Sequence, residues 1–148
     1  MASPPPNIIT GNIQMDKEHE RLFMIEDELL SLCQSGSSSH PHNCDICDVA
    51  HQTECVQKSL PLLDELLYLA YEHFVNEEQY MSALSPAEAE EHKFQHAELS
   101  SKLSALAKQC ARDAQSVRPK ELSHQIKDYL LNHVEGFDLT LADAIRKK

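Results

Sequence analysis

Two residue pairs in this chain have the spacing of metal ligands on a helix: His73 with Glu77, and His92 with His96. Because a helix turns once every 3.6 residues, residues four apart lie on one face, one turn from each other. Three further candidates lie on segments with a similar helical pattern: His19, His133 and Asp138. Together, five histidines and two carboxylates predict a site for two metal ions in a helical core.

The types of these side chains narrow the metal. A polar group on a buried helix face must be paired or metal-bound, because leaving it unpaired costs about 1 to 3 kcal/mol. Any one of these histidines alone could be an ordinary core or surface residue, but seven such residues in one layer favour a shared cause. Nitrogen and oxygen ligands without thiolate favour non-haem iron. Five histidines leave one of two irons short of six ligands, which gives a small molecule a place to bind.

Four segments would position these residues. Apolar residues recur at steps of three and four, which predicts helices beginning near Met15, Val56, Pro86 and Pro119. The third begins with an N-cap serine, a proline and the glutamate of a capping box, in the run Ser85-Pro86-Ala87-Glu88. Pro61 fits only in the opening turn of the second helix. The chain is thus expected to be all-α, an antiparallel up-down-up-down four-helix bundle with a long insertion between its first two helices.

His133 and Asp138 are five residues apart, which is about 140° around a regular helix, so they would not share a face. Gly136 between them lowers helix propensity. A single π-type turn there would bring both side chains into line. We therefore predict a helix irregularity near Gly136.

Composition limits the alternatives. With 148 residues, 41% of them apolar, the chain is expected to form one domain over residues 1–148, with a flexible arm at 1–12 that lacks the pattern of a signal peptide. A net charge of -11 argues against nucleic acid or anionic lipid as a partner. The longest apolar run, residues 66–71, is too short to span a membrane, so a cytoplasmic protein is expected.

The insertion at residues 34–55 is rich in cysteine and histidine and allows three interpretations. Cys44 and Cys47 have the CxxC spacing with which two thiolates grip one metal. A second metal site, with zinc as its ion, could use that pair with further ligands. The pair could instead be redox-active, or the thiols could have no defined role. The candidates for this second site are Cys33, His42, Cys44, Cys47, His51 and Cys55. Outside the insertion, Cys110 is expected to be a buried inert thiol and His124 a surface residue.

Four motifs together resemble a bacterial hemerythrin domain. They are the runs at residues 16–23 (DKEHERLF), 73–78 (HFVNEE), 92–96 (HKFQH) and 132–138 (NHVEGFD). The resemblance covers residues 12–145, apart from the insertion. It implies two irons with an oxo or hydroxo bridge. His92, His96 and His133 would hold one iron, His19 and His73 the other, and Glu77 and Asp138 would bridge them.

The resemblance also implies a function, namely binding of dioxygen, or sensing of oxygen or redox state through the iron pair, without catalysis by this domain. Nitric oxide or a small anion is an alternative ligand. A fused or separate signalling output, such as a diguanylate cyclase, is a further expectation. The rivals are a diiron oxidase, peroxidase or nitric oxide-handling enzyme, and a metal-stapled interaction module. Tyr129 and Leu130 stand where the family often carries a tryptophan beside the ligand pocket. Tyr129 could donate a hydrogen bond there or serve only as packing.

Overall fold

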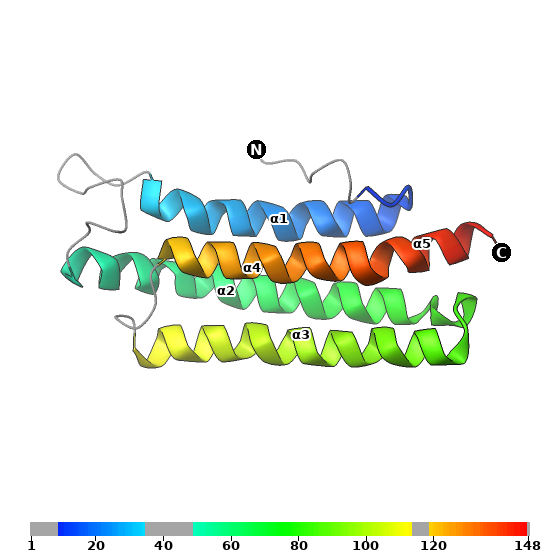
Figure 1. Cartoon of the computed structure of the whole chain (residues 1–148). Coiled ribbons are helices and arrows are strands. Elements are labelled where there is room, and N and C mark those ends of the chain that lie inside the picture. Colours follow the sequence, from blue (N-terminus) through cyan, green and yellow to red (C-terminus); the bar gives the residue numbers. More distant parts are fainter. Residues whose placement is uncertain (1–8, 35–48, 114–118, 148) are drawn as a thin grey trace.

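The computed structural model describes residues 9–34, 49–113 and 119–147, with residues 33–34, 49–52 and 119 described by their backbone alone. These residues form only helices and turns (Figure 1). In chain order the elements are α1 (Ile13–Gln34), α2 (Val49–Glu78), the 3-10 turn η2 (Met81–Ala83), α3 (Pro86–Arg112), α4 (Pro119–His133), the π-helical turn η3 (Val134–Asp138) and α5 (Leu139–Arg146). The predicted all-α class is confirmed.

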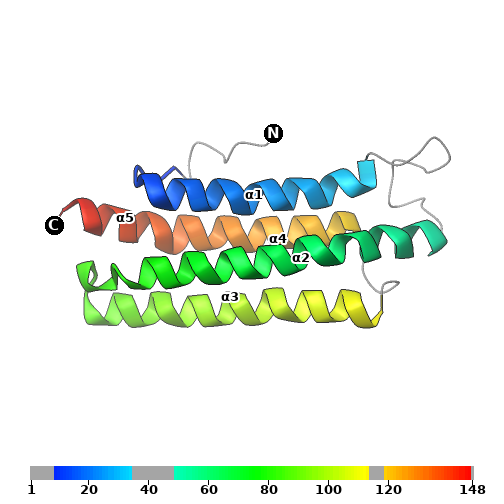
Figure 2. The same cartoon turned by 180° about the vertical axis from the view of Figure 1, so that it is seen from behind.

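The four long helices form an antiparallel bundle (Figure 1). Helix α1 packs against α2 and α4, and α2 packs against α3. Helix α4 continues through η3 into α5, so the last three elements form one long rod, as the view from behind also shows (Figure 2). The predicted four-helix bundle is therefore confirmed. No helix within the described ranges is long and apolar enough to cross a membrane.

Helix α2 differs from its prediction at its start. It begins at Val49 rather than at Val56, so residues 49–55 of the predicted insertion are helical, and Pro61 lies inside the helix instead of in its opening turn. An interior proline costs about 3 kcal/mol because it has no N–H to donate and crowds the preceding turn. The turn before it packs against the bundle, with Cys55 and Val56 at 8% and 0% exposure. That packing offsets the cost of the proline.

The core has two apolar clusters with the candidate ligands between them. A large cluster of leucines and other apolar residues fills the bundle between its four long helices, and includes Leu22, Ala70 and Val134. A small one, made of Met15, Met81, Leu141 and Ala142, closes the end near α5. Along α1, His19 lies between Met15 and Leu22. The polar layer is thus covered by apolar side chains on both sides.

The N-terminal end of the described chain is fastened to the bundle. Thr10 is buried, and its hydroxyl donates to Asp16 Oδ1 at 2.7 Å. Its carbonyl accepts from Arg146 at 3.0 Å, which links this segment to α5. The other residues of the predicted arm, 1–8, lie outside the described ranges.

The predicted capping box of α3 is present. The Ser85 hydroxyl accepts from the Glu88 N–H at 3.2 Å, and the Ser85 N–H donates to Glu88 Oε1 at 3.3 Å. Two N–H groups that have no partner within the helix are satisfied in this way.

Loss of this cap should weaken the bundle measurably. We expect Ser85→Ala to lower the free energy of unfolding by about 1 kcal/mol in urea titration. Ser101→Ala, at an exposed position within α3, is the matched control and should be neutral or slightly stabilising, because alanine has the higher helix propensity. Equal losses in the two variants would contradict a capping role.

Candidate metal centre

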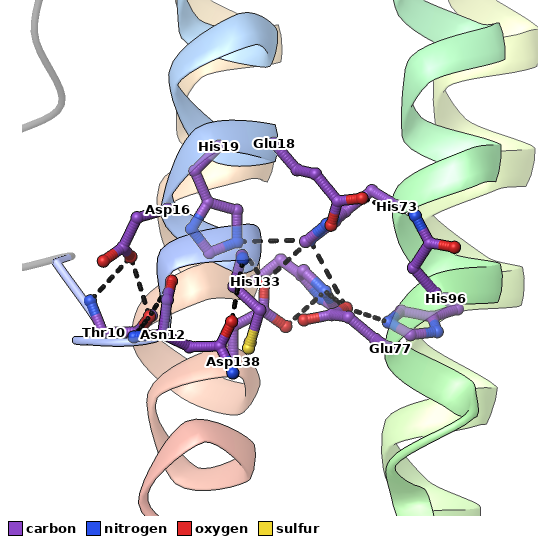
Figure 3. Close-up of polar contacts among 12 residues, drawn as sticks. Thr10, Asn12, Asp16, Glu18, His19, His73, Glu77, His96, His133 and Asp138 are labelled. Atoms are coloured by element: carbon purple, nitrogen blue, oxygen red, sulfur yellow. Dashed lines mark hydrogen bonds and ion pairs between the residues drawn. The ribbon is translucent and has the colours of Figure 1, made fainter.

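All seven predicted ligand residues meet in one buried layer. Each of these residues is at most 3% exposed. They come from every long helix and from the π turn: His19 from α1, His73 and Glu77 from α2, His92 and His96 from α3, His133 from α4, and Asp138 from η3. The close-up shows six of these side chains directed toward one another in the space between the helices (Figure 3).

The donor atoms fall into two groups that share both carboxylates. In each group, one ligand atom per residue lies within 4.8 Å of all the others. The first group consists of His92, His96, His133, Glu77 and Asp138, and the second of His19, His73, Glu77 and Asp138. Such an arrangement offers two neighbouring positions for cations, with two carboxylates available to both.

Asp138 is the centre of the layer. Its Oδ2 lies 2.7 Å from His19 Nε2 and 3.2 Å from His73 Nε2. Its Oδ1 lies 3.1 Å from His92 Nε2 and 3.0 Å from His133 Nε2. Burial alone would raise the pKa of Asp138, but the attraction of His133 and hydrogen bonds from His19 and His73 lower this pKa well below its ordinary value. Each carboxylate oxygen thus faces a different pair of imidazoles.

The pKa of Glu77 is shifted in the opposite direction to that of Asp138. Its Oε1 lies 3.0 Å from His96 Nε2, while its Oε2 is buried without a hydrogen-bond partner. Burial and the nearby charge of Asp138 raise the pKa of Glu77 well above its ordinary value. Two buried carboxylates side by side are costly unless positive charge lies between them. A bound cation would supply that charge.

Two histidines are held in the orientation of metal ligands by acidic residues behind them. His73 Nδ1 donates to Glu18 Oε1 at 2.8 Å, and His96 Nδ1 donates to Glu78 Oε2 at 3.1 Å. Asn76 in turn donates to Glu18 Oε2 at 2.5 Å. When Nδ1 carries the hydrogen-bonded proton, Nε2 can present its lone pair to the centre.

The pKa values of these two imidazoles diverge. Burial, together with repulsion from His133 and His92, lowers the pKa of His96 to about 2, so this ring is neutral. For His73, burial acts in the same direction, but hydrogen bonds to Asp138 and Glu18 raise its pKa to about 9. His73 therefore carries a proton on each ring nitrogen, with Nδ1 facing Glu18 and Nε2 facing Asp138. A metal ion would replace the proton on Nε2.

Several buried polar atoms of this layer also lack hydrogen-bond partners. They are His19 Nδ1, Glu77 Oε2 and both ring nitrogens of His133. His133 Nε2 is 3.0 Å from Asp138 Oδ1, yet this close pair does not have hydrogen-bond alignment. Orphaned buried groups are rare in folded proteins and require a specific cause. Nitrogen and oxygen donors aimed at two shared positions fit divalent metal ions of the first transition row.

The predicted irregularity at Gly136 is confirmed. Residues Val134–Asp138 form a π-helical turn, and the Leu139 N–H donates to the Val134 carbonyl, five residues earlier. With five residues in the widened turn, His133 and Asp138 point into the same layer. A Cβ atom on Gly136 would meet nothing within 4 Å, so the glycine faces open space.

The other predicted site residues have different surroundings. Leu130 is buried in the large apolar cluster, and Tyr129 packs partly buried against it, with Lys102 Nζ 5.4 Å from the centre of its ring. These contacts favour the packing role of Tyr129 over hydrogen bonding in a ligand pocket. Cys110 is 1% exposed, where burial raises the pKa of its thiol, and His124 is exposed, both as expected.

The second candidate site is mostly outside the described residues. Cys55 is buried, with its Sγ 3.8 Å from the Leu32 carbonyl. His42, Cys44 and Cys47 lie outside the described ranges, as do the side chains of Cys33 and His51. The zinc and redox interpretations of the insertion stay predictions.

Glu18, Asn76 and Glu78 were not anticipated as part of the site. Each is adjacent in sequence to a ligand residue or its helix face, and each looks like an ordinary polar surface residue. The available signal was that Glu18 precedes His19 and Glu78 follows Glu77, which places carboxylates beside the ligand faces. Only the packing of α1 and α3 against α2 shows which histidine each of them meets.

The Glu18–His73 hydrogen bond should matter for metal affinity. We expect Glu18→Ala to weaken binding at this position by about 10- to 100-fold, because outer carboxylates orient ligand imidazoles and raise their basicity. Competition with a chromophoric chelator would measure the change. Glu20→Ala, on the exposed face of α1, is the control and should bind as the unmodified chain does. Unchanged affinity in Glu18→Ala would contradict the role of Glu18.

Comparison with known protein families gives a match over most of the chain. The sequence profile described as the hemerythrin HHE cation binding domain matches residues 10–145. Searches of curated proteins and of solved structures returned no significant match. The matched range contains all seven residues of the buried layer.

Proposed function

The chain belongs to the hemerythrin HHE cation-binding family, and from this premise we propose that it is a non-haem diiron protein that binds dioxygen or senses oxygen through the redox state of its irons. The observation that carries the proposal is the position of Asp138. Its two oxygens face different histidine pairs, as a carboxylate bridging two metal ions would require.

The ligand assignment follows from the two donor groups. His92, His96 and His133 would hold one iron, His19 and His73 the other, and Glu77 and Asp138 would bridge them, along with an oxo or hydroxo group. The iron with two histidines has fewer protein ligands, so a small ligand would bind on that side. Iron bound by these residues would supply one-electron chemistry at each metal.

The protein around the layer restricts what else can happen there. Phe74 stacks on His96 with 4.2 Å between ring centres, and Phe137 lies over His133 at 5.8 Å. These rings and the two apolar clusters keep bulk water from the ligand residues. Histidine outnumbers carboxylate among the donors, which favours reversible binding over the oxidative turnover typical of carboxylate-rich diiron enzymes.

Visible absorption of the iron-loaded protein tests the proposal. The protein would be reduced without oxygen and then exposed to air. A charge-transfer band that appears in air and reverses on deoxygenation would support oxygen carriage. Prompt conversion to the diferric spectrum would support sensing through iron oxidation. If no diiron spectrum forms at all, the proposed function is wrong.

A further inference from the structure

The ligand layer is closed to solvent, so a metal ion must cross the protein shell to reach it. All seven ligand residues are at most 3% exposed, and apolar clusters cover the layer along the bundle axis. One cavity, with a volume of about 180 Å³, borders this layer, because His92 forms part of its wall. The cavity lies where the first turns of α3 approach η3 and α5.

The wall of the cavity combines a ligand residue with an acidic rim. Its lining consists of Leu84, Glu88, Glu91, His92, Gly136, Phe137 and Thr140. Glu88 and Glu91 are exposed at the mouth, whereas His92 is 1% exposed and its Nε2 lies 3.1 Å from Asp138 Oδ1. The path from solvent to the ligand layer thus passes carboxylates first and an imidazole nitrogen next.

The negative charge at the mouth of the cavity determines which solutes it attracts. Carboxylates at the mouth of a low-dielectric cleft attract cations and repel anions, and they can raise the association rate of a cation by about 10- to 1,000-fold. Among the residues that the structure describes, no Lys or Arg side chain lines the cavity. Neutral dioxygen would gain nothing from this rim, and a small anion would be repelled.

The backbone leaves the cavity open on the side formed by η3. Gly136 lines the cavity, and a Cβ atom added there would meet nothing within 4 Å. The π turn faces the cavity at this point, and because its residue here is glycine, no side chain fills the gap. The same turn that brings Asp138 into the ligand layer therefore leaves space beside His92.

We propose that this cavity is the route by which divalent metal ions reach the ligand layer, with Glu88 and Glu91 capturing the hydrated cation and His92 as the first ligand it meets. The proposal rests on the proposed metal centre and adds how that centre is loaded. It concerns the rate of loading, since neither glutamate belongs to the ligand set.

Cobalt uptake by the full-length metal-free chain would test the route. Co²⁺ is stable in air, and its visible absorption changes when histidine and carboxylate replace water. In low-salt buffer, we expect the double variant Glu88→Gln, Glu91→Gln to take up Co²⁺ about three- to tenfold more slowly than the unmodified chain, because two steering charges are lost. Glutamine can still serve in the capping box, so α3 keeps its first turn. Final cobalt content should be unchanged.

The control variant is Glu90→Gln, which removes one charge from α3 at an exposed position outside the cavity and should load at the normal rate. A steric test is independent of charge. Gly136→Leu and Thr140→Leu each place a side chain in the cavity from a different element, and each should slow uptake at high salt as well as at low salt.

The outcomes separate the two proposals. If the unmodified chain binds no Co²⁺, the metal centre itself is wrong, and the route with it. If the chain binds Co²⁺ but the double variant loads at the normal rate, or the control is slowed equally, the route is wrong and the centre stands. Normal loading of both leucine variants would also overturn the route.

Discussion

Asp138→Asn is expected to reduce the metal content of the protein from two ions per chain to less than one. Asp138 is the only residue with one carboxylate oxygen facing His19 and His73 and the other facing His92 and His133 among the described contacts. An asparagine amide has nearly the same shape, but it carries no charge and offers one acceptor oxygen in place of two. Neither metal position would keep its shared anionic ligand.

Metal analysis after loading and gel filtration would measure this loss, and far-ultraviolet circular dichroism would show that the helices remain. Asp143→Asn is the matched control, because it makes the same chemical change one helix further on. Its side chain is 49% exposed and pairs with Arg146 and Lys147. Two ions per chain in Asp138→Asn would show that Asp138 is not a bridging ligand.

The ligand residues could be predicted from the sequence because the candidate ligands and the leucines follow the same helical spacing. Steps of three and four placed six of the seven on helix faces that also carry leucines, and these faces are buried as expected. Along α3, the residues at such steps are all buried: His92, His96, Leu99, Leu103, Leu106 and Cys110. The seventh, Asp138, broke the helical period, and that conflict itself predicted the π turn.

The features that could not be predicted depend on contacts between segments distant in sequence. Helix α2 continues through Pro61 because the turn before the proline packs against the bundle, which local propensity does not show. Glu18 lies on α1 and looks solvent-facing until α2 brings His73 within 2.8 Å of it. Glu88 reads as a capping residue, and only the approach of η3 and α5 to α3 makes it the rim of a cavity.

Removing the metal should lower thermal stability by a large and specific amount. Without a cation, the layer contains two neighbouring buried carboxylates and several buried nitrogens without hydrogen bonds. Ligand binding to the folded state alone adds about 4 kcal/mol when free metal is 1,000 times its Kd. For a chain of this size, each kcal/mol of unfolding free energy shifts Tm by about 2 to 4 °C. We therefore expect the metal-free protein to melt roughly 10 °C below the iron-loaded form.

Two controls show whether such a shift in Tm comes from this site, namely a different ion and a variant that lacks one ligand. Calorimetry of chelator-treated and reloaded protein would measure it, with Mg²⁺ as the ionic control. Mg²⁺ prefers oxygen ligands and should not restore the lost stability, because five of the seven donors here are imidazoles. Asp138→Asn should show almost no shift on adding iron, since its layer lacks the shared carboxylate. If the unmodified chain melts at one temperature with and without iron, these seven side chains do not form a metal centre, and their burial must be stabilised by hydrogen bonding alone.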